Sequence, residues 1–399
     1  MIIKNRIVGI AFSVTLVVLL ALPALRWIAL RAPDGALYGY SDSLPPHPHN
    51  PMRAFFDRSL QHWIEKNFEI NLGFRALLIR SFNELNFRLF REAPKLRLYT
   101  TPTHGLYSKM SIESLNDEVV RRKTLEDRYS IEAEKLLRVQ QQLESQGKYF
   151  GVIIGTSKPY VYPNGLGSRY LVGGGSGIFD RAANFGNVLR AAGVNIIDGG
   201  PLLRKFVAKT GLETHSDSGV HWNYYAGCII ALELLDNVRN RQFNNTPILN
   251  CGEPHLAQPH MVDVDGLLLL NIWSNGGITK PTPYPTISTI GEVAWHPKIV
   301  FIGDSFSDQI RYALQQANSY SRMVTSSYFQ VRVVDDKENV KKNTDSVESD
   351  LNTNRSKLMT DIATSDIIIL QMVDYNVSRW GYDFPDYFLN HFSEGRVID

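Results

Sequence analysis

The sequence is poor in cysteine and has no excess of charge of either sign. Of its 399 residues, 42 are Lys or Arg and 40 are Asp or Glu. This balance gives no electrostatic reason to expect nucleic acid or a strongly acidic partner. No internal repeat is present, and the length suits one large domain with additions, or two domains.

Metal and nucleotide sites also lack their usual residue spacing. Cys228 and Cys251 do not form a CxxC pair, so no zinc site is predicted. The glycines at 173–175 are not followed by the Lys-Ser/Thr of a phosphate-binding loop. We therefore predict no metal and no cofactor. The cysteines leave two alternatives open: a disulfide outside the cytoplasm, or a buried free thiol at Cys228.

The N-terminus carries the clearest topological signal. Lys4 and Arg6 precede an uncharged run over 7–25, which approaches the ~20 residues that a helix needs to cross a bilayer. The positive flank favours a cytoplasmic N-terminus and an exported remainder. The alternative is a cleaved signal peptide, although its apolar core is usually only about 7–15 residues long. We expect residues 1–31 to be a single-pass anchor, or else a signal peptide.

The rest of the chain divides into two regions. Residues 32–95 begin as a Pro-rich tether, and helical spacing then predicts two amphipathic helices broken near 71–73. From 96 to 399, apolar strands alternate with helices. Strands are predicted at 149–154, 194–197, 298–302 and 366–370, and helices at 125–146, 181–192, 202–209, 223–239 and 306–318.

These strands lack polar alternation, which indicates a parallel sheet covered by helices on both faces. The predicted fold class is therefore α/β, a three-layer α/β/α sandwich. A polar segment at 335–357 has almost no large apolar residues and is expected to be a mobile insertion.

The sharpest local motif is Gly303-Asp304-Ser305, at the end of a predicted buried strand and before a helix. Ligands of parallel sheets bind beyond the carboxyl ends of the strands. A serine at this turn has its backbone N–H near a helix N-terminus, where a developing oxyanion is stabilised. The alternative is that Ser305 only caps the helix. Asp304 is interpreted as a structural acceptor at the turn.

A second motif, His221-Trp222-Asn223, opens another predicted helix. A serine nucleophile needs a base within hydrogen-bond reach, and neutral histidine suits that role near pH 7. Such a His-Trp pair alone more often serves packing. Both motifs in one α/β frame favour catalysis, with Trp222 and Asn223 as supporting residues.

Taken together, these motifs resemble the SGNH hydrolase clan and, within it, the AlgJ/AlgX-like family of alginate O-acetyltransferases. The resemblance runs from about residue 55 to the C-terminus. Its matching segments are Gly73-Phe74-Arg75, residues 152–159, Val161-Tyr162-Pro163, residues 193–198, His221-Trp222-Asn223 with Gly227, and residues 303–307.

The resemblance implies that Ser305 is the nucleophile and His221 the general base. An acetyl group would pass through an acetyl-serine to a hydroxyl of an exported polysaccharide such as alginate. It also implies a place in the inner membrane with the catalytic domain in the periplasm, and a multi-pass membrane acyltransferase as partner. A polysaccharide acetyl esterase, or a non-catalytic scaffold or glycan-binding subunit of a secretion complex, remains an alternative. Lys158 is interpreted either as a contact to an anionic substrate or as a surface lysine.

The acid of the triad departs from the family pattern. The relatives place an aspartate two residues before the histidine, and many SGNH enzymes three before, where this chain has Gly219 and Ser218. The nearest acid is Asp217, four before. We predict Asp217 as the group that orients His221, with a backbone carbonyl or a distant carboxylate as alternatives. An unoriented histidine loses much of its catalytic power, so the departure also leaves room for a non-catalytic member.

Overall fold

A computed structural model of the chain describes residues 10, 12–18, 21, 36–40, 44–71, 73–91, 98–101, 103, 105–291, 295–336, 351–393 and 396–397. Much of the predicted membrane span, 7–25, lies outside these residues. Within the described ranges, no helix combines the length and the apolar character that crossing a bilayer requires. The chain divides into two units, 1–96 with 267–277, and 97–266 with 278–399.

The second unit is built on a six-stranded sheet in the order β11-β10-β9-β12-β3-β4. Its strands are β3 (Tyr149–Gly155), β4 (Ile196–Asp198), β9 (Lys298–Gly303), β10 (Arg322–Ser327), β11 (Val331–Asp336) and β12 (Ile367–Val373). Five strands run parallel, and β11 pairs antiparallel with β10 at one edge. The four predicted strands are present; β10 and β11 escaped prediction because their sequences are more polar.

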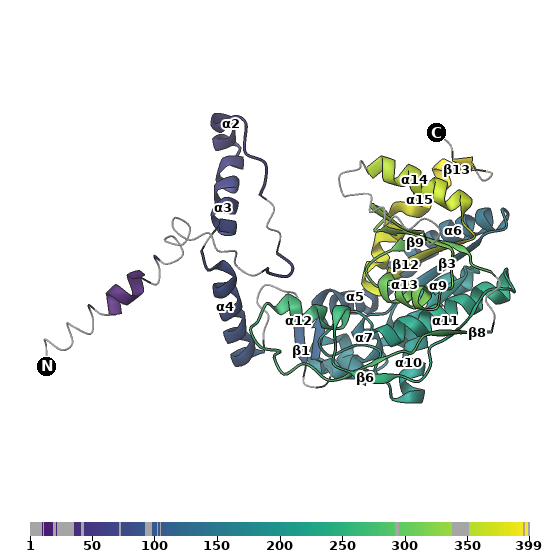
Figure 1. Cartoon of the computed structure of the whole chain (residues 1–399), viewed down its shortest axis with the longest axis horizontal. Helices are drawn as coiled ribbons and strands as arrows, with labels where there is room; N and C mark the ends of the chain where they lie inside the picture. The colour runs from purple at the N-terminus through teal and green to yellow at the C-terminus, as the bar shows by residue number, and fades with distance from the viewer. Residues whose placement is uncertain are drawn as a thin grey trace. The chain divides into compact units, whose positions relative to one another are not determined.

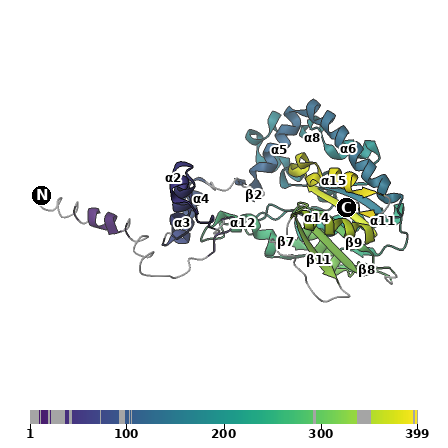
Figure 2. The same cartoon turned by 90° about the horizontal axis from the view of Figure 1, so that it is seen from above.

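Helices cover both faces of this sheet (Figures 1 and 2). One face carries α10 (Gly199–Thr210), α11 (Tyr224–Arg241) and α13 (Ser307–Gln316), and the other carries α6 (Arg122–Glu144), α9 (Phe185–Ala192), α14 (Leu351–Thr364) and α15 (Phe384–His391). Successive side chains of a strand point to opposite faces. In β9, Phe301 therefore packs into the first core and Ile302 into the second, which explains why the strand is apolar over 299–302.

Smaller elements surround the sheet. They are β1 (Leu98–Thr101), β2 (Gly105–Ser108), α5 (Lys109–Val120), α7 (Lys158–Val161), α8 (Ile178–Arg181), β5 (Ile248–Asn250), β6 (His255–Ala257), α12 (Asp265–Leu270), β7 (Thr282–Tyr284), β8 (Ser288–Ile290), β13 (Phe392–Ser393) and β14 (Arg396–Val397).

Two predicted segments differ from the structure. The helix predicted at 181–192 is interrupted, because Asn184 adopts a left-handed backbone (φ 50°) and its side chain caps α9. The insertion predicted at 335–357 is shorter at both ends, since 335–336 belong to β11 and 351–357 to α14. Its centre, 337–350, lies outside the described residues.

Cys228 of α11 and Cys251, which follows β5, form a disulfide with their Cα atoms 5.9 Å apart. The bond settles the choice that the sequence left open. Protein disulfides persist mainly in oxidising compartments.

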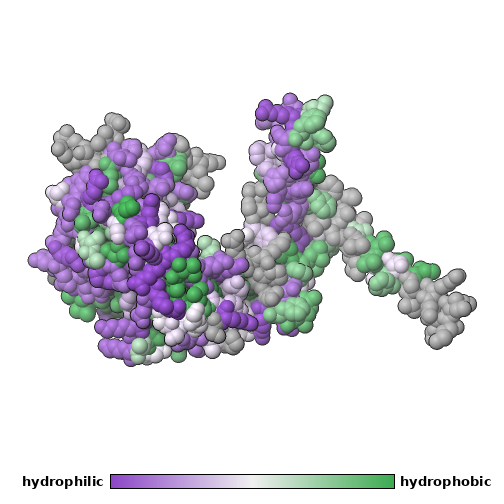
Figure 3. All heavy atoms as spheres, turned by 180° about the vertical axis from the view of Figure 1, so that it is seen from behind, coloured by the Kyte–Doolittle hydropathy of each residue, from purple (hydrophilic) through white to green (hydrophobic). Residues whose placement is uncertain are grey.

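The first unit contains α2 (Pro51–Phe56), α3 (Ser59–Asn71) and α4 (Arg75–Phe90), with the predicted break falling between α3 and α4. Segment 267–277 packs with these helices: Asn83 donates to the carbonyl of Leu270 at 2.8 Å, and Glu84 accepts from the N–H of Trp273 at 3.0 Å. The sequence had placed this segment in the 96–399 region. Several large apolar side chains of the helices are exposed, and hydrophobic patches are visible there in Figure 3.

Candidate active site

Ser305 stands in the turn between β9 and α13, at the carboxyl edge of the sheet. Asp304 shapes this turn from a buried position, only 2% exposed. Its Oδ1 accepts from the N–H of Phe306 at 3.0 Å, and its Oδ2 accepts from the N–H of Val373 at 2.8 Å and the hydroxyl of Tyr382 at 2.8 Å. Asp304 is thus an acceptor that ties the turn to the chain after β12.

Gly303 is required by close packing. A Cβ there would lie 2.7 Å from Oε1 of Gln371 and 3.0 Å from its backbone oxygen. The same Oε1 accepts from the N–H of Asp304 at 3.0 Å. The glycine therefore lets β9 approach β12 where the turn that carries Ser305 begins.

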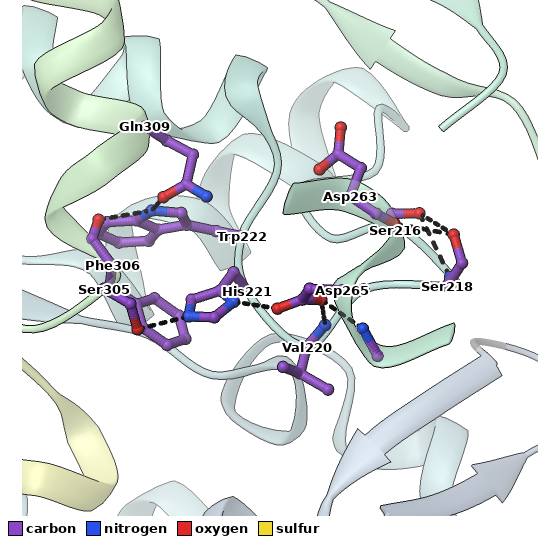
Figure 4. Close-up of polar contacts among 12 residues, drawn as sticks. Ser216, Ser218, Val220, His221, Trp222, Asp263, Asp265, Ser305, Phe306 and Gln309 are labelled. Atoms are coloured by element: carbon purple, nitrogen blue, oxygen red, sulfur yellow. Dashed lines mark hydrogen bonds and ion pairs between the residues drawn. The ribbon is translucent and has the colours of Figure 1, made fainter. Parts of the chain in front are cut away.

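His221 reaches Ser305 from the loop before α11. Its Nε2 lies 2.6 Å from Oγ of Ser305, and its Nδ1 is hydrogen-bonded to Oδ2 of Asp265 (Figure 4). Because a carboxylate only accepts, Nδ1 carries the proton and Nε2 is free to accept from the serine hydroxyl. The three side chains form a Ser–His–Asp arrangement, which can perform acyl transfer.

Asp265 holds the histidine in a fixed orientation. It is the first residue of α12, and its Oδ1 accepts from the N–H of Val220 at 2.9 Å and from that of Gly266 at 2.6 Å. These bonds leave Oδ2 for His221. The ring of Phe306 packs against the imidazole, with 4.5 Å between centroids.

The orienting acid is therefore Asp265, whereas the sequence pointed to Asp217. Asp217 lies in the loop that β2 anchors, where its carbonyl accepts from the N–H of Leu106 at 2.8 Å. Asp265 follows His221 by 44 residues, so no local spacing pointed to it. The sequence allowed for Asp265 only through the alternative that a distant carboxylate orients His221.

Asp265 also shifts the affinity of His221 for protons. Burial lowers the pKa of His221, but the hydrogen bond and charge of Asp265, with smaller contributions from Asp304 and Asp308, outweigh burial and raise it overall. The pair thus favours the protonated form of the imidazole.

Lys158 is buried and does not lie on the surface. Its side chain is 2% exposed, and Nζ donates to three backbone carbonyls: Leu106 at 2.7 Å, Ser216 at 2.7 Å and Gly219 at 2.8 Å. Burial lowers its pKa to about 8, although nearby carboxylates act against this. Lys158 clamps the loop that ends in His221, so the interpretation as a surface lysine is wrong, and its three carbonyl partners favour a structural role over contact with a substrate.

Trp222 and Asn223 are fully buried supports. Nε1 of Trp222 donates to the carbonyl of Phe306 at 3.0 Å, which links the histidine loop to the turn that carries Ser305. Asn223 caps α11 by accepting from the N–H of Ala226 at 2.9 Å. Across the described part of the chain, no group of three or more His, Cys, Asp or Glu residues is placed to hold a metal ion.

No family model and no curated protein sequence matches the chain. Among solved structures, the O-acetyltransferase domain of Pseudomonas putida AlgJ matches at 14% identity and a TM-score of 0.41, covering 73% of this chain and 99% of that one. Pseudomonas aeruginosa AlgX matches at 12% identity and a TM-score of 0.46, covering 76% of this chain and 71% of AlgX. Bacillus cereus PatB1 with a sulfonyl adduct matches at 10% identity and a TM-score of 0.38, covering 65% of this chain and 93% of PatB1. AlgJ and AlgX, which the sequence resembles, are thus among the matched structures.

Proposed function

We propose that this chain is an O-acetyltransferase that acetylates an exported polysaccharide through an acetyl-serine at Ser305. The observation that carries this proposal is the continuous set of contacts from Asp265 through His221 to Ser305, with 2.6 Å between Nε2 and Oγ. Ser305 and His221 are each half-buried, so the pair stays within reach of a substrate.

The proposed reaction has two halves. In the first, Oγ of Ser305 attacks the acetyl carbonyl while its proton moves to Nε2 of His221, and Asp265 stabilises the resulting imidazolium. The carbonyl electrons move onto oxygen, where the N–H of Ser305 donates to them. The leaving group departs with the proton from His221. In the second half, a sugar hydroxyl attacks the acetyl-serine, His221 takes its proton, and that proton returns to Ser305.

The acetyl group and the polysaccharide acceptor are what the sequence resemblance implies. The main reason to consider a non-catalytic scaffold was the lack of an acid at the family's position, and Asp265 removes that reason. An esterase would use the same acetyl-serine and differ only in the attack of water.

We also propose that the catalytic unit works in the periplasm, tethered to the inner membrane beside a multi-pass acyltransferase that supplies the acetyl group. The uncharged run at 7–25 and the Cys228–Cys251 disulfide support this location. Crosslinking of the full chain in membranes tests the partner.

The experiment compares the full-length protein with Ser305→Ala, using a chromogenic acetyl ester with and without an oligosaccharide acceptor. We expect Ser305→Ala to lower acetyl release about 10⁴-fold or more. The exposed Ser176→Ala is the matched control and should retain full activity. Retained activity in Ser305→Ala refutes the nucleophile. Release of free acetate alone, unchanged by the acceptor, refutes transfer and leaves an esterase.

A further inference from the structure

We propose that the hydroxyl of Tyr328 is a second donor of the oxyanion hole, beside the backbone N–H of Ser305. The inference rests on the proposed role of Ser305 as nucleophile. Tyr328 belongs to neither sequence motif, and its assignment comes from the neighbouring strand.

The sheet register brings Tyr328 to the nucleophile turn. Strand β10 runs parallel to β9 with Ser327 opposite Gly303. Tyr328 follows directly, and its N–H donates to the carbonyl of Gly303 at 2.8 Å. Both strands thus end at the same edge of the sheet, and Tyr328 follows β10 beside the turn that carries Ser305.

The backbone at this point has an unusual conformation. Tyr328 and Phe329 both adopt left-handed conformations, with φ of 53° and 58°. Bulky residues rarely do so, and such strain concentrates at functional sites. The turn places Phe329 in the core, 1% exposed, while Tyr328 stays half-buried at the edge.

The residues that fix the nucleophile turn also brace the tyrosine ring. Tyr382 packs edge-on against Tyr328 with 5.4 Å between centroids, and the hydroxyl of Tyr382 donates to Asp304. The guanidinium of Arg379 lies 5.6 Å from the centre of the Tyr328 ring. The ring is therefore positioned relative to Ser305 through shared partners.

With the backbone of Tyr328 bonded to Gly303, its hydroxyl is near enough to Ser305 for the serine to influence its pKa. Burial, followed by the charge of Asp304, raises the pKa of Tyr328, while the side chain and backbone N–H of Ser305 act on the hydroxyl in the opposite direction. The net increase keeps the hydroxyl protonated at neutral pH, so it can donate.

The inferred step transfers no proton from tyrosine. As Oγ of Ser305 bonds to the acetyl carbon, the C=O π electrons become a lone pair on oxygen, and the serine proton goes to His221. The oxyanion then accepts hydrogen bonds from the N–H of Ser305 and from the hydroxyl of Tyr328, which rotates toward it. Collapse restores the C=O bond and expels the leaving group.

Tyr328→Phe removes the hydroxyl and keeps the ring. We expect kcat for acetyl-ester turnover to fall about 10²–10³-fold, as when one oxyanion donor is lost, with KM within about threefold. Labelling of Ser305 by a fluorophosphonate, whose phosphoryl oxygen occupies the same hole, should slow in parallel. Tyr320→Phe is the matched control: Tyr320 is buried and donates to Asp335 at 2.6 Å, and its loss should leave kcat unchanged.

The inference is overturned if Tyr328→Phe keeps at least a third of the wild-type kcat. It is also overturned if activity falls only in proportion to the folded fraction, followed by circular dichroism. Ser305→Ala separates this failure from that of the proposed function. An inactive Ser305→Ala beside an active Tyr328→Phe removes only the oxyanion role, whereas an active Ser305→Ala removes both.

Discussion

Replacing Asp265 with asparagine tests how the histidine is oriented. The amide keeps the shape of the side chain and its acceptor for the N–H of Val220, at 2.9 Å from Oδ1 in the wild type. It presents an NH₂ group where Oδ2 now accepts from Nδ1 of His221. The imidazole then gains more by accepting at Nδ1 and carrying its proton on Nε2. That tautomer cannot take the proton of Ser305.

The expected loss of kcat is large because the tautomer with its proton on Nε2 presents no base to Ser305. In serine hydrolases the equivalent exchange lowers kcat about 10⁴-fold, or about 5.5 kcal/mol of transition-state stabilisation. The remaining His221 also loses the hydrogen bond and charge that outweigh burial and raise its pKa. Its pKa should therefore fall, and the acidic limb of kcat/KM should move to lower pH.

The assay is a pH series of acetyl-ester turnover for Asp265→Asn, with Asp217→Asn as the matched control. Both variants exchange an aspartate near the histidine loop for its amide. We expect Asp217→Asn to keep kcat within a few-fold and to leave the acidic limb in place. The reasoning is refuted if Asp217→Asn abolishes turnover, or if Asp265→Asn keeps more than a tenth of the wild-type kcat.

Two further predictions concern buried ionisable groups. Lys158→Met should lower the free energy of unfolding by about 3 kcal/mol or more, because three carbonyls lose their donor. Urea denaturation measures this change, and the exposed Lys205→Met should change the free energy of unfolding by less than about 0.5 kcal/mol. Burial raises the pKa of Glu118 to about 7 from an ordinary 4.5, so its contribution to stability is present below about pH 4.5 and is lost as pH rises through 7. Glu118→Gln should therefore become more stable than the wild type between pH 5 and 8, by up to about 3 kcal/mol. The exposed Glu113→Gln should show no such trend. Parallel curves of unfolding free energy against pH for the wild type and Glu118→Gln would contradict this.

The central strands were predictable because almost all of their residues are buried. Both faces of β9 and β12 are covered, so their segments 299–302 and 367–370 are apolar runs that stand out from the helices around them. Strand β11 lies at the sheet edge and carries Arg332 and Asp335, so its sequence gives no comparable signal. In such a sheet, edge strands with polar faces are the hardest strands to predict from the sequence, because they lack a continuous apolar run.

The positions of Ser305 and His221 were also readable from sequence, for a local reason. Ser305 and His221 each stand at a helix start, where a short motif fixes the backbone and hence the side-chain direction. Lys158 shows the opposite case. A lysine in a polar segment is normally solvated, and only the fold brings three carbonyls around it.

The acid and the tyrosine are set by tertiary structure alone. Asp265 reaches His221 because the N–H of Val220 and that of Gly266 hold its other oxygen, and this geometry exists only once the segment after β6 has folded back onto the histidine loop. Tyr328 is placed by register with β9, a strand that ends 25 residues before it. An orienting acid and an oxyanion donor need only a position relative to the reacting atoms, so different chain segments can supply them. A missing acid at the family's spacing is therefore weak grounds for predicting an inactive protein, because a carboxylate from a distant segment can still accept from Nδ1 of the histidine.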